Sequence, residues 1–554
     1  MTIQVDLHLT NAYILNTFAC RFEQAELYIK NDTIVHRGKS DLFAAAQTVD
    51  MQGKYIAPGL IDAHMHIESS LLAPSEFGRL VLTRGVTRVF ADPHEIASVA
   101  GVAGLQYMID EARRSPLHIH YMLPSSVPAT SFEHAGAVLH AEQLKPFYDY
   151  PEVQGLAEVM DFPAVANEDP DMLQKFADAH AAGRHIDGHG AGLTREQLSI
   201  YRMHGIDTDH EADGPLAAAN RLAAGFAMFV REGTVERDEV AILPVVNPAN
   251  QHRVAFCTDD KSAADIQREG SIDYNVALAV QHGMPLTQAL TMASYNAANA
   301  HHLQNVGALT DGYVADLIVF DSPDHFVVDQ VMVAGQWVDF TSLEQKSVTP
   351  LANQALNVEI ALADFALPLT GSKAHVIQVQ PQHITTQHAI SEVPVVDGEF
   401  VANQQYAKIA VFERYHNLGH SVGIIEGFQL KEGAIAGTIA HDSHNLMVAG
   451  VSDEAMLLAA QTLKEIGGGL VVVDGQLNVT TVPLAIGGLM SDEPYEVLIE
   501  KTDILNAAFK RISPVEFDPF ITLSFMALPV IPSLKITDQG LFDFAKFDFI
   551  DINA

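Results

Sequence analysis

The chain has very few cysteines and few basic residues for its length. Only Cys20 and Cys257 occur among 554 residues, which excludes a disulfide framework, a CxxC redox pair and a zinc site built from thiolates. Lysine and arginine together number 32 against 69 acidic residues, and the formal net charge of -37 would repel nucleic-acid phosphates and anionic membrane surfaces. These shortages predict a protein of a reducing compartment with no nucleic-acid partner.

Long apolar segments are also missing. No stretch of about 18 uninterrupted apolar residues occurs, and the first residues, MTIQVDLHLT, lack a basic segment followed by an apolar one. We therefore expect a cytoplasmic protein with no membrane partner. Hydrophobic residues make up 48% of the chain and charged residues 18%, which is typical of folded proteins, and the length predicts two or three domains.

Strand-like and helix-like patterns divide the chain into three parts. Residues 1–55 alternate apolar and polar positions, and a similar strand-rich stretch returns at 305–345, which predicts one β domain interrupted by an insertion. Within the insertion, residues 56–304, apolar strand-like pieces alternate with helix-like pieces, as in the βα units of a parallel sheet or barrel. Residues 350–554 begin again with mixed strands and helices and are predicted to form a third domain.

The first chemical motif is PGLIDAHMH, in which an apolar strand ends in His64 and His66. Side chains two residues apart on a strand point the same way, so two neutral imidazoles could bind one divalent cation from one side. A bare HxH pair is more often two ordinary surface histidines. The apolar strand before this pair favours the metal interpretation.

Further candidate ligands follow later strand-like pieces: Glu158, His189, His210, and Asp259 or Asp260. Taken singly, each has a plainer explanation as a paired acid or as a core or helix-capping histidine. Together, six ligands from different strands of a barrel would converge at its carboxyl-end mouth and would suffice for two metals.

These motifs resemble the adenine deaminase family of the amidohydrolase superfamily. The likeness lies in PGLIDAHMHIESS, ADPHE, GLAEVM, GHGAGL and TDHE, and in EGFQLKEGAIAGTIAHDSHNLMVAG, PLAIGGLMSDE and DPFITLSFMALPVIPSLKITDQGLFD of the last third. It covers nearly the whole chain and implies an α/β protein: a (β/α)8 TIM-like metallo-hydrolase barrel, a flanking β-sandwich domain and an additional α+β C-terminal domain. It also implies hydrolytic deamination of adenine to hypoxanthine and ammonia by a metal-activated hydroxide, in purine salvage.

The resemblance further implies a centre of two divalent cations, Mn or Fe(II), with Zn as an alternative. His64, His66 and Asp259 would hold one cation, His189 and His210 the other, and Glu158 would bridge them. Asp259 is preferred to Asp260 because superfamily members place the ligand directly after the small residue, here Thr258. We also expect adenine as the small-molecule partner and a homo-oligomer of two or more chains.

Proton transfer requires further groups. Asp259 is predicted to accept a proton from the attacking hydroxide and deliver it to the departing amine. A second acid must assist the ring nitrogen, and Glu211 and Glu95 are the candidates. Glu211 could equally be a carboxylate at a helix start, whereas His94 and Glu95 could instead shape the pocket or hold an accessory metal.

Two other functions compete with deamination. Hydantoinase-like relatives that cleave cyclic amides or imides bridge their metals with a carboxylated lysine, but between Lys54 and Lys261 the only lysines are Lys145 and Lys175, neither at a strand end. A non-catalytic binding protein would be expected to have lost ligands, yet all six are present. Glu158 at the expected position therefore favours the deaminase.

Three further patterns carry less weight. Gly419–Gly423 fits GxSxG around Ser421, but the following segment is strand-like, whereas a nucleophile elbow leads into a helix. The HDSH run at 441–444 places its residues too close in sequence for a triad, and the resemblance suggests that it lies near the active-site mouth. His140 and Glu142 match HxE, but the accompanying PCxxC of the other nucleobase deaminases is absent.

Overall fold

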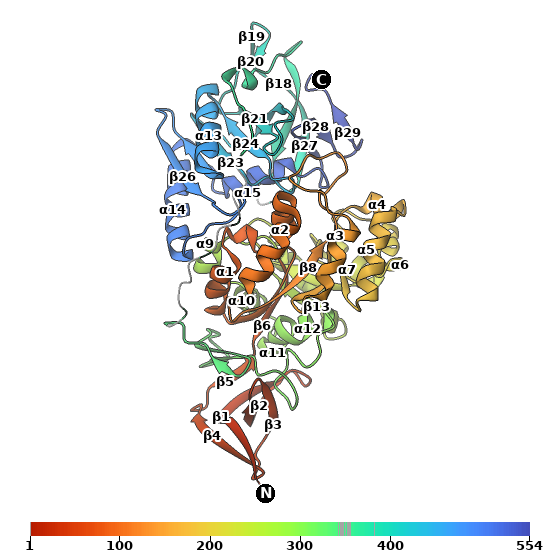
Figure 1. Ribbon diagram of the computed structural model, residues 1–554, viewed down its shortest axis with the longest axis vertical. Coiled ribbons are helices and arrows are strands. Elements are labelled where there is room, and N and C mark those ends of the chain that lie inside the picture. The colour runs from red at the N-terminus through yellow and green to blue at the C-terminus, as the bar shows by residue number, and fades with distance from the viewer. Residues whose placement is uncertain (1, 342, 344–347, 349–350, 352–355, 382) are drawn as a thin grey trace.

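The computed structural model describes residues 2–341, 343, 348, 351, 356–381 and 383–554. Figure 1 shows an elongated molecule with the N-terminal strands at one end, a barrel in the middle and the C-terminal third at the other end. The predicted boundary between residues 345 and 350 falls mostly outside the described residues. Within the described part, every helix is too short or too polar to cross a membrane.

A barrel of parallel strands forms the centre of the molecule, as predicted. Its strands run in the order β13-β12-β11-β10-β9-β8-β7-β6. They are β6 (Leu60–Met65), β7 (Val86–Ala91), β8 (His118–Pro124), β9 (Val153–Val159), β10 (His185–Gly188), β11 (Thr208–Asp209), β12 (Ala227–Arg231) and β13 (Val254–Cys257). The first and last strands meet because Asp259 N donates to His64 O at 3.1 Å and His66 N donates to Asp259 O at 3.4 Å.

Helices surround this barrel in the alternating βα order that the sequence predicts. The α-helices are α1 (Pro74–Leu82), α2 (His94–Ala112), α3 (Ala141–Leu144), α4 (Phe162–Ala166), α5 (Pro170–Ala181), α6 (Arg195–Met203), α7 (Pro215–Ala224), α8 (Glu239–Ile242), α9 (Ala263–Arg268), α10 (Ile272–Gln281), α11 (Leu286–Thr291) and α12 (Ala297–Ala300). Strands buried on both faces read as continuous apolar runs rather than alternating ones. Accordingly, all six residues of β7 and all six of β6 are buried.

The barrel interior is filled by apolar side chains rather than by a channel. Ile61, Phe90, Met122, Phe229 and Ala255 come from different strands and form one buried cluster. Their packing fixes the strands relative to one another and leaves the polar residues at the strand ends facing the mouth.

A second sheet unites both flanks of the barrel segment. Its order is β16-β15-β14-β5-β1-β2-β3, with β4 paired to β1. The strands are β1 (Ile3–Asn16), β2 (Arg21–Lys30), β3 (Thr33–Arg37), β4 (Phe43–Asp50), β5 (Tyr55–Pro58), β14 (Leu317–Phe320), β15 (Gln330–Val333) and β16 (Gln336–Trp337). β5 pairs with β14 and leads directly into β6, so this sheet fixes the start of the first barrel strand.

The C-terminal third contains a mixed sheet, covered by helices, as expected for an α+β fold. Its order is β18-β17-β22-β21-β24-β23-β25-β26, and only β17 and β22 run parallel. The strands are β17 (Lys373–Val379), β18 (Thr386–Glu392), β21 (Tyr406–Phe412), β22 (His420–Glu426), β23 (Ala434–Gly437), β24 (Leu446–Gly450), β25 (Gly469–Val473) and β26 (Val479–Pro483). The long helices are α13 (Asp453–Ile466) and α14 (Tyr495–Ile512), with the shorter α15 (Pro519–Ser524) beyond them.

This third part packs directly on the carboxyl-end side of the barrel. Ser491 N donates to Leu71 O at 2.8 Å, and Arg79 of α1 pairs with Glu496 of α14. The segment between β23 and β24 lies against the start of α2, where Asp442 Oδ1 is 3.5 Å from His94 Nε2, and against the connection between β8 and α3, where Asn445 Nδ2 donates to His134 O at 2.9 Å. The C-terminal part therefore borders the region where the candidate ligands lie.

Candidate active site at the barrel mouth

His64 and His66 lie at the end of β6 with their rings turned toward the same space. Their Nε2 atoms are 3.3 Å apart. His64 Nδ1 lies 2.9 Å from Asp187 Oδ2, and His66 Nδ1 lies 3.0 Å from the backbone oxygen of Asp92. Because these oxygens can only accept, each Nδ1 donates, and a neutral ring then presents the lone pair of Nε2 to the shared space.

Glu158, at the end of β9, lies between the two groups of histidines. Its carboxylate is 2.8 Å from His189 Nδ1 and 2.9 Å from His210 Nε2 on one side. On the other side it is 3.6 Å from His66 Nε2 and 3.8 Å from His64 Nε2. A single carboxylate thus touches both predicted ligand groups.

Asp259 faces the histidines of β6, whereas Asp260 points elsewhere. Asp259 Oδ1 lies 3.3 Å from His66 Nε2 and 3.8 Å from His64 Nε2. Its backbone has a φ of 56°, a left-handed conformation that aspartate tolerates better than most residues. Asp260 instead accepts a hydrogen bond from Ser69. The geometry therefore agrees with the preference for Asp259.

We call His64, His66, Glu158, His189, His210 and Asp259 the barrel cluster. All six side chains are buried, and the donor atoms of His64, His66 and Asp259, and those of His64, Glu158 and His210, lie close enough to share an ion. His189 Nε2 and His210 Nδ1 have no hydrogen-bond partner among the described residues. Imidazole and carboxylate donors in this combination suit Mn, Fe or Zn, so the residues present fit a metal centre.

The charges of the barrel cluster are strongly coupled. Burial lowers the pKa of His210, but the facing carboxylates, above all Glu158, outweigh burial and raise it to about 10. Burial raises the pKa of Glu158, yet His189 and His210 outweigh it and hold this pKa well below its ordinary value. Without a cation, protons on the histidines balance the buried carboxylates.

Glu211 and Glu95, the two candidates for the second acid, differ in environment. Glu211 is ion-paired with Arg231, which also donates to Asp259 Oδ2 at 3.1 Å. Burial raises the pKa of Glu211, but Arg231 outweighs this and lowers it. Glu95 Oε1 accepts from Ser69 Oγ at 3.1 Å, and burial raises its pKa. The two carboxyl groups therefore differ in the direction of their pKa shifts.

Several residues that orient the barrel cluster were missed by the sequence reasoning. Asp187 lies two residues before His189 on β10, and the same alternation that places His64 beside His66 could have indicated it. Arg231 ends β12 just as the candidate ligands end their strands, but a search for metal ligands does not indicate it because arginine is not a metal ligand. The contact of His441 with Glu95, at 3.8 Å, had no signal in motif spacing, and only the resemblance suggested that the run at 441–444 lies near the active-site mouth.

The weaker motifs find structural roles. Ser421 lies within β22, and its hydroxyl donates to the backbone oxygen of Thr537, so the strand–turn–helix arrangement of a nucleophile elbow is not formed there. Lys175 donates to Ser125 O at 2.8 Å, and Lys145 pairs with Asp178 at 2.9 Å. Each of these lysines is thus engaged away from the barrel cluster.

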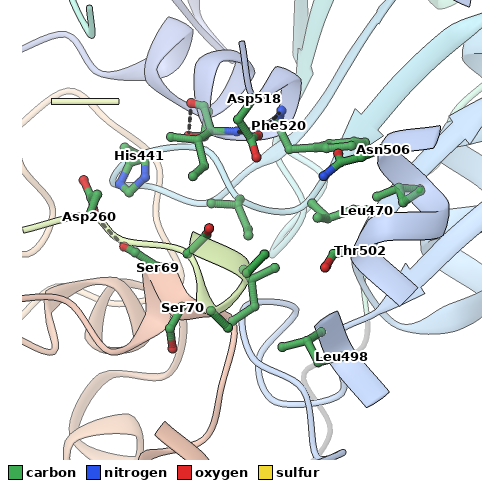
Figure 2. Close-up of a pocket in the computed structure, with 18 residues that line it drawn as sticks. Ser69, Ser70, Asp260, His441, Leu470, Leu498, Thr502, Asn506, Asp518 and Phe520 are labelled. Atoms are coloured by element: carbon green, nitrogen blue, oxygen red, sulfur yellow. Dashed lines mark hydrogen bonds between the residues drawn. The ribbon is translucent and has the colours of Figure 1, made fainter. Parts of the chain in front are cut away.

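A pocket lies beside the site, between the barrel and the C-terminal part. Figure 2 shows His441, Asp260 and Ser69 near one another on one side of it, and Leu470, Leu498 and Phe520 around the rest. Side chains of Thr502 and Asn506 on α14 also line it. Its walls come from both parts of the molecule, and its polar side adjoins the groups around Glu95.

Comparison with known proteins assigns the chain to a family. The Amidohydrolase family matches residues 55–338, and the Adenine deaminase C-terminal domain matches residues 383–548. Proteins named adenine deaminase in Leuconostoc citreum and Lactiplantibacillus plantarum are 63% and 48% identical, over 100% of this chain and 100% and 98% of theirs. Adenine deaminase 1 of Oenococcus oeni is 62% identical, over 100% of both chains.

Among solved structures, the chain is similar to N-acetyl-D-glucosamine-6-phosphate deacetylase from Mycobacterium smegmatis, with a TM-score of 0.46 and 18% identity over 60% of this chain and 100% of that one. The relatives that match from end to end, together with the two family matches, cover both the barrel and the C-terminal part. The chain belongs to the adenine deaminase family of the amidohydrolases.

Proposed function

We propose that this protein catalyses the hydrolytic deamination of adenine to hypoxanthine and ammonia. The observation that most supports this function is the position of Glu158, whose carboxylate lies within 3.8 Å of His64 and His66 and within 2.9 Å of His189 and His210. The choice of adenine follows from the names of the full-length relatives. A second function is not favoured by any of these contacts.

The barrel cluster would hold two divalent cations, which we propose to be Mn or Fe(II), with Zn as an alternative. His64, His66 and Asp259 would bind one, His189 and His210 the other, and Glu158 would contact both. When bound, the cations would lower the pKa of water and so supply a nucleophile near neutral pH. Buried Arg231 pairs with Glu211 and with Asp259, and these ion pairs keep the arrangement oriented in the absence of substrate.

Asp259 is the residue best placed to move the proton. Its Oδ1 faces the histidines of β6, while Oδ2 accepts from Arg231 at 3.1 Å, so one oxygen is anchored and the other faces the reacting region. As water adds to C6 of the purine, Asp259 accepts its proton and then returns it to the amino group, which leaves as ammonia. Its pKa is held well below the ordinary value because the nearby histidines and Arg231 outweigh burial, so it starts as the base.

Glu95 is proposed to protonate a ring nitrogen as C6 becomes tetrahedral, and to take up the remaining C6 hydroxyl proton as the carbonyl forms and ammonia leaves. Its raised pKa favours the protonated carboxyl that this role requires, whereas the ion pair with Arg231 keeps Glu211 ionised. Glu211 then serves to hold Arg231 against Asp259. The two carboxyl groups would therefore have different tasks because their neighbours differ.

The test is to incubate the metal-loaded protein with adenine, adenosine, cytosine and hydantoin, and to measure ammonia and ring-opened product. We expect ammonia and hypoxanthine in equal amounts from adenine. Ring opening of hydantoin without ammonia from adenine would support a cyclic-amide hydrolase instead. Protein stripped with a chelator should be inactive and should recover on addition of Mn²⁺. Full activity of the stripped protein would refute the metal-dependent mechanism.

A further inference from the structure

A second group of histidines and carboxylates lies where the C-terminal part meets the barrel. We call it the interface cluster: His94, Glu95, His441, Asp442 and His444. His94 and Glu95 begin α2, and the other three come from the segment between β23 and β24. All five side chains are buried, the most exposed being His441 at 5%. The mechanism proposed above uses only Glu95 among them.

The polar atoms of the interface cluster face one another as ion pairs that are longer than hydrogen bonds. His94 Nε2 and His441 Nδ1 each lie 3.5 Å from Asp442 Oδ1, and His441 Nδ1 lies 3.8 Å from Glu95 Oε1. Among the described residues, both ring nitrogens of His94, Oδ2 of Asp442 and Nε2 of His444 have no hydrogen-bond partner. Buried polar atoms that remain unpaired in this way cost stability and call for a missing partner.

The spacing of these atoms is compatible with ligands that share one cation. A charge-assisted hydrogen bond between imidazolium and carboxylate would close to about 2.7–2.9 Å. Ligands about 2.1 Å from one ion in tetrahedral geometry are separated by about 3.4 Å. The contacts at 3.5 Å fit the second case. They also match the 3.3 to 3.8 Å that separates Asp259 from His66 and His64 in the barrel cluster.

Neighbouring groups hold the two histidines in this orientation. His94 Nδ1 faces Asp92 Oδ2 at 3.4 Å, so its opposite nitrogen turns toward Asp442. The ring of His441 stacks on Phe525, with centroids 4.5 Å apart and planes at 9°. A carboxylate behind a ligating histidine is the usual outer-shell arrangement of metal sites. His441 also lines the pocket of Figure 2.

We propose that His94, His441 and Asp442 bind a third divalent cation, distinct from the pair proposed for the barrel cluster. His94 belongs to the barrel segment and the other two to the C-terminal part, so this cation joins the two parts across their interface. The donor set of two imidazoles and one carboxylate suits zinc, manganese or iron. The reaction proposed above requires only two cations, so this site adds to that function without being part of it.

The first test is crystallography on the full-length protein loaded with Mn²⁺, with diffraction recorded at the manganese absorption edge. We expect an anomalous peak at about 2.0–2.3 Å from His94 Nε2, His441 Nδ1 and Asp442, in addition to two peaks in the barrel cluster. Peaks in the barrel cluster alone would overturn the third site and leave the proposed function intact. Absence of peaks from the barrel cluster would instead count against the proposed function.

The second test counts metal in solution by mass spectrometry of the purified, dialysed protein. We expect three metal ions per chain in the wild type and two in His441→Ala. The nearly isosteric Asp442→Asn should also bind two, and it serves as a second variant in case His441→Ala misfolds. The control His416→Ala changes a histidine of the same part whose side chain is 61% exposed, and should retain three. Equal metal content in all four proteins would overturn the proposal.

Discussion

Buried histidines occur in two regions of the barrel, and their surroundings differ. In the interior, His301 Nε2 donates to Ala63 O at 2.7 Å and its ring stacks on Phe90 at 3.5 Å, while His185 Nε2 lies 2.8 Å from Thr208 Oγ1. At the mouth, the Nε2 atoms of His64 and His66 face carboxylates at 3.3 to 3.8 Å. The rings in both regions are held by hydrogen bonds and stacking, but His64 and His66 at the mouth also direct their Nε2 atoms toward the shared carboxylates of Glu158 and Asp259.

The same contrast appears in their proton affinity. Burial, reinforced by neighbouring His185, lowers the pKa of His301 to about 3, so it stays neutral in the folded protein. At the mouth, the carboxylates outweigh burial and raise the pKa of His210 to about 10. Burial alone therefore does not identify a ligand histidine; the number and distance of facing carboxylates do.

The largest effect should come from removing the shared carboxylate at the mouth. In Glu158→Gln, we expect at least a ~100-fold loss of ammonia release from adenine and a lower metal content, because changes around metal ligands alone cost roughly 10–100-fold. Steady-state kinetics and metal analysis measure both. Glu142→Gln, a change at an exposed position of α3, is the control. If Glu158→Gln released ammonia at the wild-type rate, the shared carboxylate would not be needed for catalysis. The proposed difference between the mouth and the interior would then be wrong.

Metal affinity should depend on pH because the two regions hold protons differently. A cation that binds at the mouth must displace the proton held by His210, whose pKa is about 10, so the affinity of the stripped protein for Mn²⁺ should rise with pH. For each proton released, the rise is about tenfold per pH unit. Calorimetric titrations between pH 6 and 8 would measure it. An affinity that stays constant over this range would show that the mouth histidines are already neutral.

An interior histidine should affect stability rather than catalysis. The pKa of His301 is 6.5 in the unfolded reference and about 3 in the folded protein, so the unfolded chain binds more protons and stability falls as pH drops from 6.5 toward 3. His301→Phe lacks this loss. The variant should be less stable than wild type at pH 7. The difference in the free energy of unfolding between the two proteins should narrow by roughly 1.5 kcal/mol between pH 6.5 and 5. Urea unfolding of the two stripped proteins measures the gap, and a constant gap would contradict the lowered pKa.

The smallest effect is expected away from both regions. Ser421→Ala removes a hydroxyl that donates to the Thr537 backbone on the C-terminal sheet, so turnover should stay within about twofold of wild type. The lost hydrogen bond should cost about 0.5–1.5 kcal/mol of stability. Activity and thermal unfolding can be measured on one preparation. A folded but inactive variant would restore the serine-hydrolase interpretation.

The alternation of strand-like and helix-like pieces predicted a parallel sheet or barrel, and the family resemblance implied the barrel, whereas alternation along one strand predicted that His64 and His66 lie together. The motif PGLIDAHMH forms β6, and alternation on a strand places both rings on one side. The neighbours that decide proton affinity were not predictable, because they come from distant strands. Glu211 was a candidate acid for its place after His210, but its ion pair with Arg231, twenty residues on, makes it an anchored carboxylate.

Contacts across the interface were the least predictable. His94 and Asp442 are separated by 348 positions, and neither strand periodicity nor motif spacing relates the start of α2 to the segment between β23 and β24. The sequence therefore indicated that His94 and Glu95 had some role near the site without giving their partners. Those partners depend on how the C-terminal sheet rests on the barrel, which only the three-dimensional arrangement provides.

The seam between β6 and β13 links chemistry to folding. Asp259 hydrogen-bonds through its backbone to His64 and His66, so the first and last strands of the barrel carry proposed ligands of the same cation. A chain being synthesised would lack this pocket until the eighth strand has emerged and docked. Ions that bind only the finished seam shift the folding equilibrium from the open chain toward the closed barrel. The cellular metal supply would therefore influence how much folded protein accumulates as well as how fast it works.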